Sequence, residues 1–157
     1  MFDLAIIGGG PAGVAAGIYA ARKRLKTILI TETFGGQSTE SMGIESWIGT
    51  KKISGPDFGK ALEEHLRSCS DKSVEIKTGE KVTNISKSDG NFKVETASNS
   101  YTAKTVLITT GSTRRKLDIP GAKELENKGI TYCASCDGLA RRVRVRRGEH
   151  VLSSQTR

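Results

Sequence analysis

The sequence has few aromatic residues, three cysteines and no long apolar run. Aromatic residues make up 5% of the 157 residues and apolar residues 36%, both low for a globular chain. Where thiols are kept reduced, as in the cytoplasm, a close cysteine pair is expected to be redox-active or metal-binding and not a structural staple. No stretch approaches the roughly 18 apolar residues that span a bilayer, and no basic segment precedes the apolar run at residues 4–7. We therefore expect a cytoplasmic protein without a leader or a membrane anchor.

The net charge of +8 comes mainly from the last residues of the chain. Residues 141–157 contain six Arg, one Glu and no Lys, which leaves +3 for the preceding 140 residues. Such a run is typical of a basic binding arm, but no aromatic residue that would stack on bases is interleaved with it. The abrupt change from Lys to Arg favours a reading-frame change near residue 139, and we expect no nucleic-acid partner.

The first 35 residues predict a β-α-β unit. Apolar runs at residues 2–7 and 27–31 are short enough for buried strands, and helical spacing of apolar residues joins them over residues 11–23. This pattern implies parallel strands with a right-handed crossover. Residues 34–56 are predicted to be a glycine-rich loop, followed by a helix that Ser54 caps and whose apolar face includes Phe58, Leu62, Leu66 and Cys69.

A small antiparallel part should follow. Strand patterns occur at residues 74–77, 81–85, 92–96 and 101–103, with Asp89-Gly90 as a plausible hairpin turn. The run Thr105-Val106-Leu107-Ile108-Thr109 then predicts a further buried strand, which ends at Thr110-Gly111.

A glycine motif lies between the first strand and the first helix. Gly8-Gly9-Gly10-Pro11-Ala12-Gly13 fits the pattern Gly-x-Gly-x-x-Gly, and its position between strand and helix makes the match specific. Gly8 would permit the turn, Gly10 would let a pyrophosphate approach the backbone, and Gly13 would let the helix pack closely. The helix N-terminus would attract the phosphates.

An acidic residue follows at the distance expected of a ribose ligand. Glu32 comes 24 residues after Gly8, near the usual spacing of about 20 residues, and its carboxylate favours an unphosphorylated adenosine ribose, as in FAD or NAD. The alternative is a glycine-rich turn that binds no nucleotide, with Glu32 merely solvated.

The second group of functional candidates is Cys133-Ala134-Ser135-Cys136-Asp137. Two cysteines at this spacing close a redox disulfide or bind a metal, and Asp137 is placed to move protons. Zinc is the competing interpretation, because His65 and Cys69 would complete four ligands. Both residues fall on the apolar face of the helix after Ser54, so we interpret them as core residues and Cys69 as a buried, inert thiol.

In this order the motifs resemble the low-molecular-weight thioredoxin reductases and the flavoprotein subunit of alkyl hydroperoxide reductase. The resemblance extends over about residues 2–138. It rests on the glycine motif together with residues 19–22, 34–37, 45–49, 109–111, 119–121 and 129–138.

The resemblance implies an electron path from NADPH through FAD to a Cys133–Cys136 disulfide, and from there to a thioredoxin-like dithiol protein. Cys136 would face the flavin, Cys133 would attack the partner, and Asp137 would be the acid/base residue. The implied FAD ligands are Gly8, Gly10, Pro11, Ala12, Gly13, Glu32, Gly35, Gly36, Gln37, Ser46, Thr110 and Gly111. No metal is implied, and the full-length family is homodimeric.

The chain departs from the family in two respects. Ser46 replaces the usual Asn, which removes a hydrogen bond near the flavin. The second glycine-rich loop, which binds NADPH in the family, is not found. We therefore predict an α/β fold: a partial, three-layer, FAD-binding Rossmann-like domain with a small antiparallel crossover, truncated at the start of the NADPH domain.

Three segments are expected in this fold. Residues 1–115 would be the N-terminal part of the FAD domain, residues 116–138 the crossover with the Cys-x-x-Cys pair, and residues 139–157 an aberrant tail. The alternative function is a non-catalytic FAD-binding fragment, and in either case the chain alone should not turn over NADPH.

Overall fold

The computed structural model describes residues 1–112, 115–125 and 130. The chain divides into two compact units, Met1–Thr113 and Arg114–Arg157. All helices and strands of the described residues lie in the first unit. In the second unit, a turn is closed by the Ala122 N–H, which donates to the Ile119 carbonyl at 3.2 Å.

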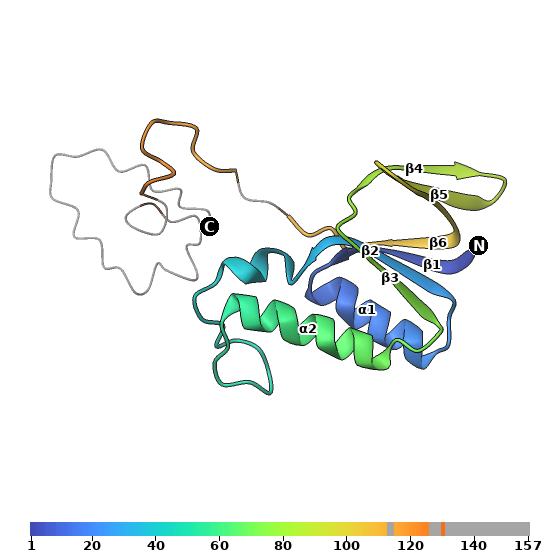
Figure 1. Ribbon diagram of the computed structural model, residues 1–157, viewed down its shortest axis with the longest axis horizontal. Coiled ribbons are helices and arrows are strands. Elements are labelled where there is room, and N and C mark those ends of the chain that lie inside the picture. The colour runs from blue at the N-terminus through green and yellow to red at the C-terminus, as the bar shows by residue number, and fades with distance from the viewer. Residues whose placement is uncertain (113–114, 126–129, 131–157) are drawn as a thin grey trace, which may run out of the picture. The chain divides into compact units, whose positions relative to one another are not determined.

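The first unit begins with the predicted β-α-β unit. Strand β1 (Phe2–Gly9), helix α1 (Pro11–Arg22) and strand β2 (Thr27–Phe34) are followed by helix α2 (Gly55–Cys69) and strand β3 (Val74–Thr78). The three strands pair in parallel, and both helices lie on the same face of the sheet (Figure 1). The expected parallel crossover is therefore confirmed.

An antiparallel part completes the six-stranded sheet, whose order is β3-β2-β1-β6-β5-β4. Strands β4 (Val82–Ser88) and β5 (Asn91–Thr96) form a hairpin. Asp89 and Gly90 at its turn have φ values of 51° and 80°, the left-handed pair that a tight hairpin needs. The predicted hairpin is thus confirmed.

Two apolar clusters separate three layers. Side chains alternate between the faces of a strand, so Ile6 of β1 faces the helices while Ala5 and Ile7 face the antiparallel strands. The helix-side cluster is completed by Val14, Leu29, Phe34, Phe58, Leu62 and Leu66. The cluster on the opposite face is completed by Ile28, Ile30, Val94 and Ala103. This is the three-layer α/β arrangement that the sequence predicted.

Strand β6 (Ser100–Ile108) corrects two predictions. The sequence suggested separate strands at residues 101–103 and 105–109, but one continuous strand pairs with β5 through Ala103 and with β1 through Ile108. The run was also expected to be buried. Leu107 and Ile108 are instead 40% and 63% exposed, because the pairing with β5 ends at Ala103 and, within the described residues, nothing covers the end of β6.

Helix α2 confirms one prediction and corrects another. The Ser54 hydroxyl accepts a hydrogen bond from the Asp57 N–H at 3.2 Å, as the capping pattern predicted. His65, which we expected in the core, is exposed, and Cys69 is only partly buried. Both residues lie in the last two turns of the helix, on either side of the fully buried Leu66. Helical spacing alone did not show that the apolar face narrows there.

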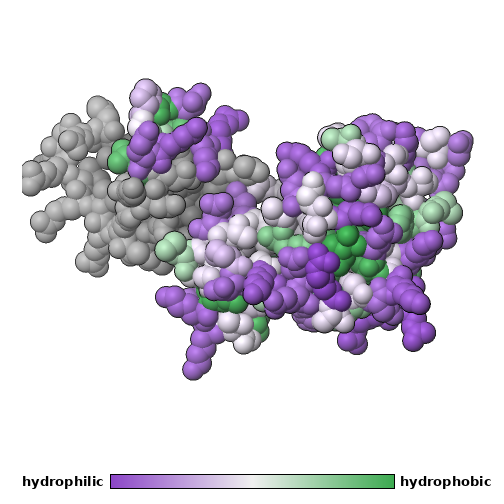
Figure 2. Space-filling model, viewed as in Figure 1, coloured by the Kyte–Doolittle hydropathy of each residue, from purple (hydrophilic) through white to green (hydrophobic). Residues whose placement is uncertain are grey.

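The described residues that are visible in Figure 2 are largely hydrophilic, with small separate apolar patches. No helix of the described residues is long and apolar enough to span a membrane.

Candidate functional site

The candidate site lies where β1, β2 and β6 end side by side. Gly9 of β1 pairs with Phe34 of β2, and Ile7 pairs with Ile108 of β6. The Gly35 N–H donates to the Gly9 carbonyl at 2.9 Å. In open α/β sheets, ligands bind at the carboxyl ends of parallel strands, and the predicted glycine motif lies at this corner.

Two glycines of the motif are required by the fold itself. A Cβ atom at Gly13 would lie 1.9 Å from the Gly8 carbonyl oxygen, so only glycine lets the helix approach the strand. Gly8 has φ +113°, and a Cβ there would lie 2.4 Å from the Thr109 carbonyl oxygen. These contacts agree with the turn and packing roles that the sequence suggested for Gly8 and Gly13.

Gly10 is different, because the protein fold does not require a glycine there. Its φ is −73° and its ψ −178°, which any residue adopts. A Cβ at Gly10 would meet no atom of the described chain within 4 Å. Space is therefore left directly above this backbone, as expected if a bound group lies against Gly10.

The start of α1 suits an anionic group. Pro11 occupies the first helical position and no described side chain caps the helix, while Ala12 is exposed. The first N–H groups of a helix have no acceptor within it and carry partial positive charge. The first turn contains no acidic residue. A diphosphate therefore fits both the space and the charge of this corner.

Glu32 lies near the end of β2, two residues before the Phe34 that pairs with Gly9. Its carboxylate is 3.7 Å from Lys81 Nζ, and its side chain is 60% exposed. The Gly79 N–H donates to the Glu32 carbonyl at 3.2 Å, which brings the β3–β4 connection alongside. Glu32 is thus available to a ribose, and Lys81 is a neighbour that no sequence pattern indicated.

Thr109 was not among the predicted site residues, although it belongs to the quoted motif at residues 109–111. Its hydroxyl donates to the carbonyls of Ile7 at 2.9 Å and Gly8 at 3.2 Å. It therefore fixes the turn from the side of β6. The nearby Thr110 is exposed and Gly111 has φ +64°.

A shallow hollow of about 250 Å³ lies beside this corner. Its polar lining residues are Thr110 and, from β4, Thr83 and Asn84. Its apolar lining residues are Ile7, Val82, Ile85 and Ile108. Of the predicted cofactor ligands, Thr110 alone lines it.

Gly35, Gly36 and Gln37 belong to a segment that the sequence left as loop, but residues Gly36–Glu40 form a 3-10 helix, η1. Gly35 and Gly36 have φ values of +89° and +54°, and a Cβ at Gly36 would lie 3.6 Å from Gly10 Cα. These two residues therefore adjoin residues 8–13, which we call the phosphate loop. Ser46 is exposed and lies between Ile44 and Ile53, which form an isolated antiparallel bridge.

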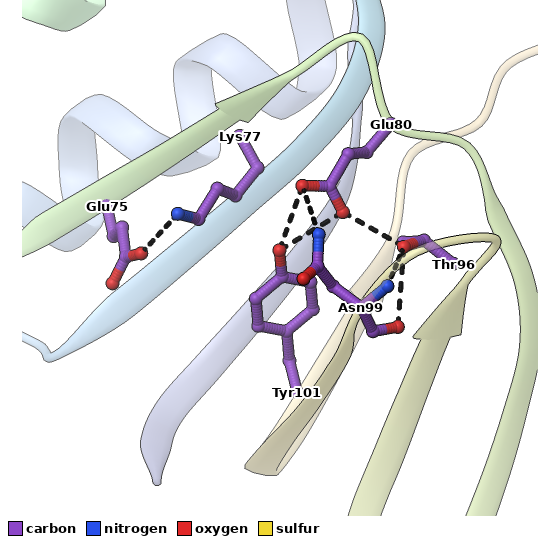
Figure 3. Close-up of polar contacts among 6 residues, drawn as sticks. All are labelled: Glu75, Lys77, Glu80, Thr96, Asn99 and Tyr101. Carbon is purple, nitrogen blue, oxygen red and sulfur yellow. Dashed lines mark hydrogen bonds and ion pairs between the residues drawn. The ribbon is translucent and has the colours of Figure 1, made fainter.

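A polar cluster around Glu80 joins the antiparallel strands to β3 (Figure 3). The Glu80 carboxylate accepts hydrogen bonds from the Thr96 hydroxyl at 3.0 Å, the Asn99 amide at 3.0 Å and the Tyr101 hydroxyl at 3.0 Å. Desolvation raises the pKa of Glu80, but these hydrogen bonds and the nearby Lys77 outweigh it, so the pKa lies below the usual value. The Glu80 N–H also donates to the Thr31 carbonyl at 3.2 Å.

Cys133, Cys136 and Asp137 lie outside the described residues. Two ligands of the zinc alternative, Cys133 and Cys136, therefore also lie outside the described residues. Within the described residues, His, Cys, Asp and Glu form no group of three that would hold a metal. Cys69 is a free thiol there.

Comparison with known proteins identifies the family. The sequence model of the pyridine nucleotide-disulphide oxidoreductases matches residues 2–151. The chain belongs to this family. This is an oxidoreductase family for which a flavin cofactor is implied, in agreement with the resemblance drawn from the motifs.

The relatives of this chain fall into two groups. The F subunit of alkyl hydroperoxide reductase of Staphylococcus epidermidis is 41% identical over 138 residues, which are 87% of this chain and 27% of that protein. A protein of Bacillus subtilis named NADH dehydrogenase is 38% identical over the same length. The chain therefore spans about a quarter of the length of these relatives.

Solved structures give the second group. Thioredoxin reductase from Streptococcus pyogenes superimposes with a TM-score of 0.77 at 39% identity, covering 88% of this chain and 44% of that chain. The Lactococcus lactis thioredoxin reductase gives a TM-score of 0.71 at 37% identity over 88% and 45% of the two chains. The predicted partial Rossmann-like fold is confirmed.

Proposed function

We propose that the chain binds FAD at the corner where residues 8–13 join β1 to α1, which we call the glycine corner. We also propose that it takes part in flavin-dependent reduction of a protein disulfide. One observation supports this proposal most: the backbone at Gly10 is left open although the fold does not require a glycine there. The diphosphate would lie against Gly10, Pro11, Ala12 and the start of α1. Glu32 would bind the adenosine ribose.

The other ligands in this proposal surround the same corner. Gly35, Gly36 and Gln37 would contact the cofactor beside Gly10, and Thr110 and Gly111 would contact it from the end of β6. Ser46 belongs to the proposed set through the family pattern alone.

The redox step is assigned to Cys133 and Cys136. FAD supplies two electrons when it is bound and reduced. The Cys133–Cys136 disulfide would accept both electrons together with two protons, one from Asp137 and one released by the reduced flavin, so that its S–S bond breaks and a dithiol forms. Cys133 then attacks a disulfide of the partner, and Cys136 resolves the mixed disulfide, which leaves the partner as a dithiol and this chain oxidised again.

Both groups of relatives support a partner that contains a redox-active disulfide. The partner is a thioredoxin-like protein in this proposal, while the similarity to the alkyl hydroperoxide reductase protein supports a peroxiredoxin-type partner. NADPH as the electron source, a homodimer and a cytoplasmic location are further parts of the proposal.

Thiol counting tests the redox step. The FAD-loaded chain would be photoreduced without oxygen, quenched in acid and titrated for thiols. We expect two more thiols per bound flavin than before reduction, an increase that C136S abolishes and C69S does not. Flavin reduction with no gain of thiols in the wild-type chain would contradict the assignment.

Mixed-disulfide trapping tests the roles of the two cysteines. C136S should form a stable adduct with a partner whose own resolving cysteine has been removed and whose remaining cysteine carries a small thiol in a mixed disulfide. Cys133 then displaces the small thiol, and no further cysteine remains to release the complex. C133S should form none. Non-reducing electrophoresis with thioredoxin and with a peroxiredoxin-type protein distinguishes the two partner classes, and adducts with C133S alone would reverse the assigned roles.

A second candidate is an FAD-binding polypeptide without turnover. The chain spans 27% of the alkyl hydroperoxide reductase protein and 44% of the Streptococcus thioredoxin reductase. All the proposed FAD ligands lie within the described residues. This candidate predicts FAD binding but no oxidation of NADPH. Reduction of thioredoxin by NADPH and this chain alone, at an enzyme-like rate, would contradict it.

A further inference from the structure

We propose that Gly55 and Gly59 of α2 are positioning residues, which hold residues 35–40 at the distance from the phosphate loop that FAD binding requires. The proposal rests on the proposed FAD site. It adds two residues that have no predicted contact with the cofactor and act through the segment that they support.

The contact between α2 and residues 35–40 leaves no room for side chains. A Cβ at Gly55 would lie 2.3 Å from the Ser38 carbonyl oxygen and 2.6 Å from the Thr39 carbonyl oxygen. Both atoms belong to the backbone, so rotation of a side chain cannot relieve the clash. An alanine at position 55 would therefore displace η1.

Gly59 makes the second close contact, one turn further along the same face of α2. Its Cβ position lies 3.2 Å from the Phe34 carbonyl oxygen and 3.2 Å from Thr39 Cγ2. From the opposite side, a Cβ at Gly35 would lie 2.9 Å from Gly59 Cα. The two backbones are thus in direct contact.

The supported segment is fixed at both ends. At its start, the Gly35 N–H donates to the Gly9 carbonyl at 2.9 Å, beside the open backbone of Gly10. After its end, the Gly55 N–H donates to the Ser41 carbonyl at 2.9 Å. A shift forced at Ser38 and Thr39 is therefore passed to Gly35 and Gly36, which adjoin the phosphate loop.

Helix stability does not explain these two glycines. Gly59 lies inside α2, where a glycine costs about 1 kcal/mol relative to alanine. Alanine at position 59 would therefore favour α2 itself, whereas the close approach of residues 35–40 needs glycine. Measuring both stability and FAD affinity in an alanine variant therefore separates the effect on the helix from the effect on residues 35–40.

The test compares FAD affinity and stability in G59A and G55A. We expect G59A to bind FAD about tenfold or more weakly, while its apo form keeps the wild-type circular dichroism and melts no earlier than the wild type. G55A should lose more affinity, because its contacts are closer. G17A is the matched control.

Gly17 also lies at a helix contact, but its Cβ would meet Leu66 Cδ1 at 2.8 Å, the end of a flexible side chain. FAD affinity in G17A should stay within about threefold of the wild type. T39S in the G59A background removes Cγ2, one of the two atoms that the new methyl group meets. This double variant should recover part of the lost affinity, which a loss of overall stability would not allow.

The outcomes separate the two proposals. Wild-type affinity in both G55A and G59A would overturn the positioning role, even if the wild type binds FAD well. Failure of the wild-type chain to bind FAD would instead overturn the proposed function. If G55A fails to fold, the FAD affinities of G59A and of the G59A/T39S double variant still test the positioning role. An affinity loss in G59A that T39S leaves unchanged would count against the contact between residue 59 and Thr39.

Discussion

Residues of the glycine corner differ in what makes them necessary. Gly8 and Gly13 are fixed by contacts of 2.4 Å and 1.9 Å that a Cβ atom would make with carbonyl oxygens. Gly10 has an ordinary backbone conformation and open space around it. The motif therefore combines two positions that the fold requires to be glycine with one position, Gly10, that the proposed ligand would explain.

This difference predicts opposite effects of the same substitution. G10A should leave the apo protein folded with nearly unchanged stability, since the residue before Pro11 is extended, as that position prefers. It should weaken FAD binding about tenfold or more, because a methyl group would occupy the space of the diphosphate. Urea unfolding and flavin fluorescence titration measure the two quantities.

G13A is the matched comparison. It should lower the free energy of unfolding even without FAD, because its methyl group overlaps the Gly8 carbonyl. Equal loss of apo stability in G10A and G13A would contradict the assigned difference.

At Glu80, the hydrogen-bond cluster predicts a pH effect on stability. The pKa of Glu80 in the folded protein lies below its ordinary value of 4.5. The ionised Glu80 carboxylate therefore contributes its full stabilisation of the folded state above pH 4.5. This stabilisation is lost as the pH falls through the folded-state pKa. E80Q should be less stable than the wild type at neutral pH, and the difference should shrink in acid. Urea unfolding from pH 7 to pH 3 measures it, and a pH-independent difference would contradict the carboxylate's role.

Among the elements, β6 shows which predictions needed more than the local sequence. The β-branched run at residues 105–109 correctly predicted a strand, because local composition favours one. Burial depends on which segments cover the strand, and within the described residues nothing covers Leu107 and Ile108. Burial of β1, by contrast, was predicted correctly, because β1 lies between β2 and β6 in the sheet and both of its faces are covered by the two apolar clusters.

The unequal burial of two leucines provides a test at this scale. L29A should cost about 2–5 kcal/mol of unfolding free energy, because Leu29 is fully buried in β2. L107A should cost less than about 1.5 kcal/mol, since Leu107 is 40% exposed at the end of β6. Denaturant unfolding of both variants measures the difference, and equal costs would show that β6 is covered in solution.

The candidate site shows the same limit of sequence-based prediction. Spacing alone located the glycine motif and Glu32, because these depend on a local strand-turn-helix pattern. Lys81, Thr109 and Gly59 come to the corner from distant parts of the chain. Nothing in their sequence neighbourhoods determines the contacts that the fold creates.

At the scale of the whole molecule, our proposal assigns the binding of the adenosine and diphosphate of a dinucleotide to the described residues. The parallel strands bring Glu32, the glycine motif and the end of β6 to one corner. The β4–β5 hairpin and the Glu80 cluster support the face of the parallel strands opposite the helices. Nucleotide binding by this unit should therefore depend on adenosine and diphosphate groups and not on an isoalloxazine alone.

A competition titration tests this claim most directly. We predict that the wild-type chain binds FAD to saturation at one equivalent, that ADP displaces it, and that FMN, which has neither adenosine nor diphosphate, does not. Absence of FAD binding at excess cofactor, or displacement by FMN but not by ADP, would contradict the account.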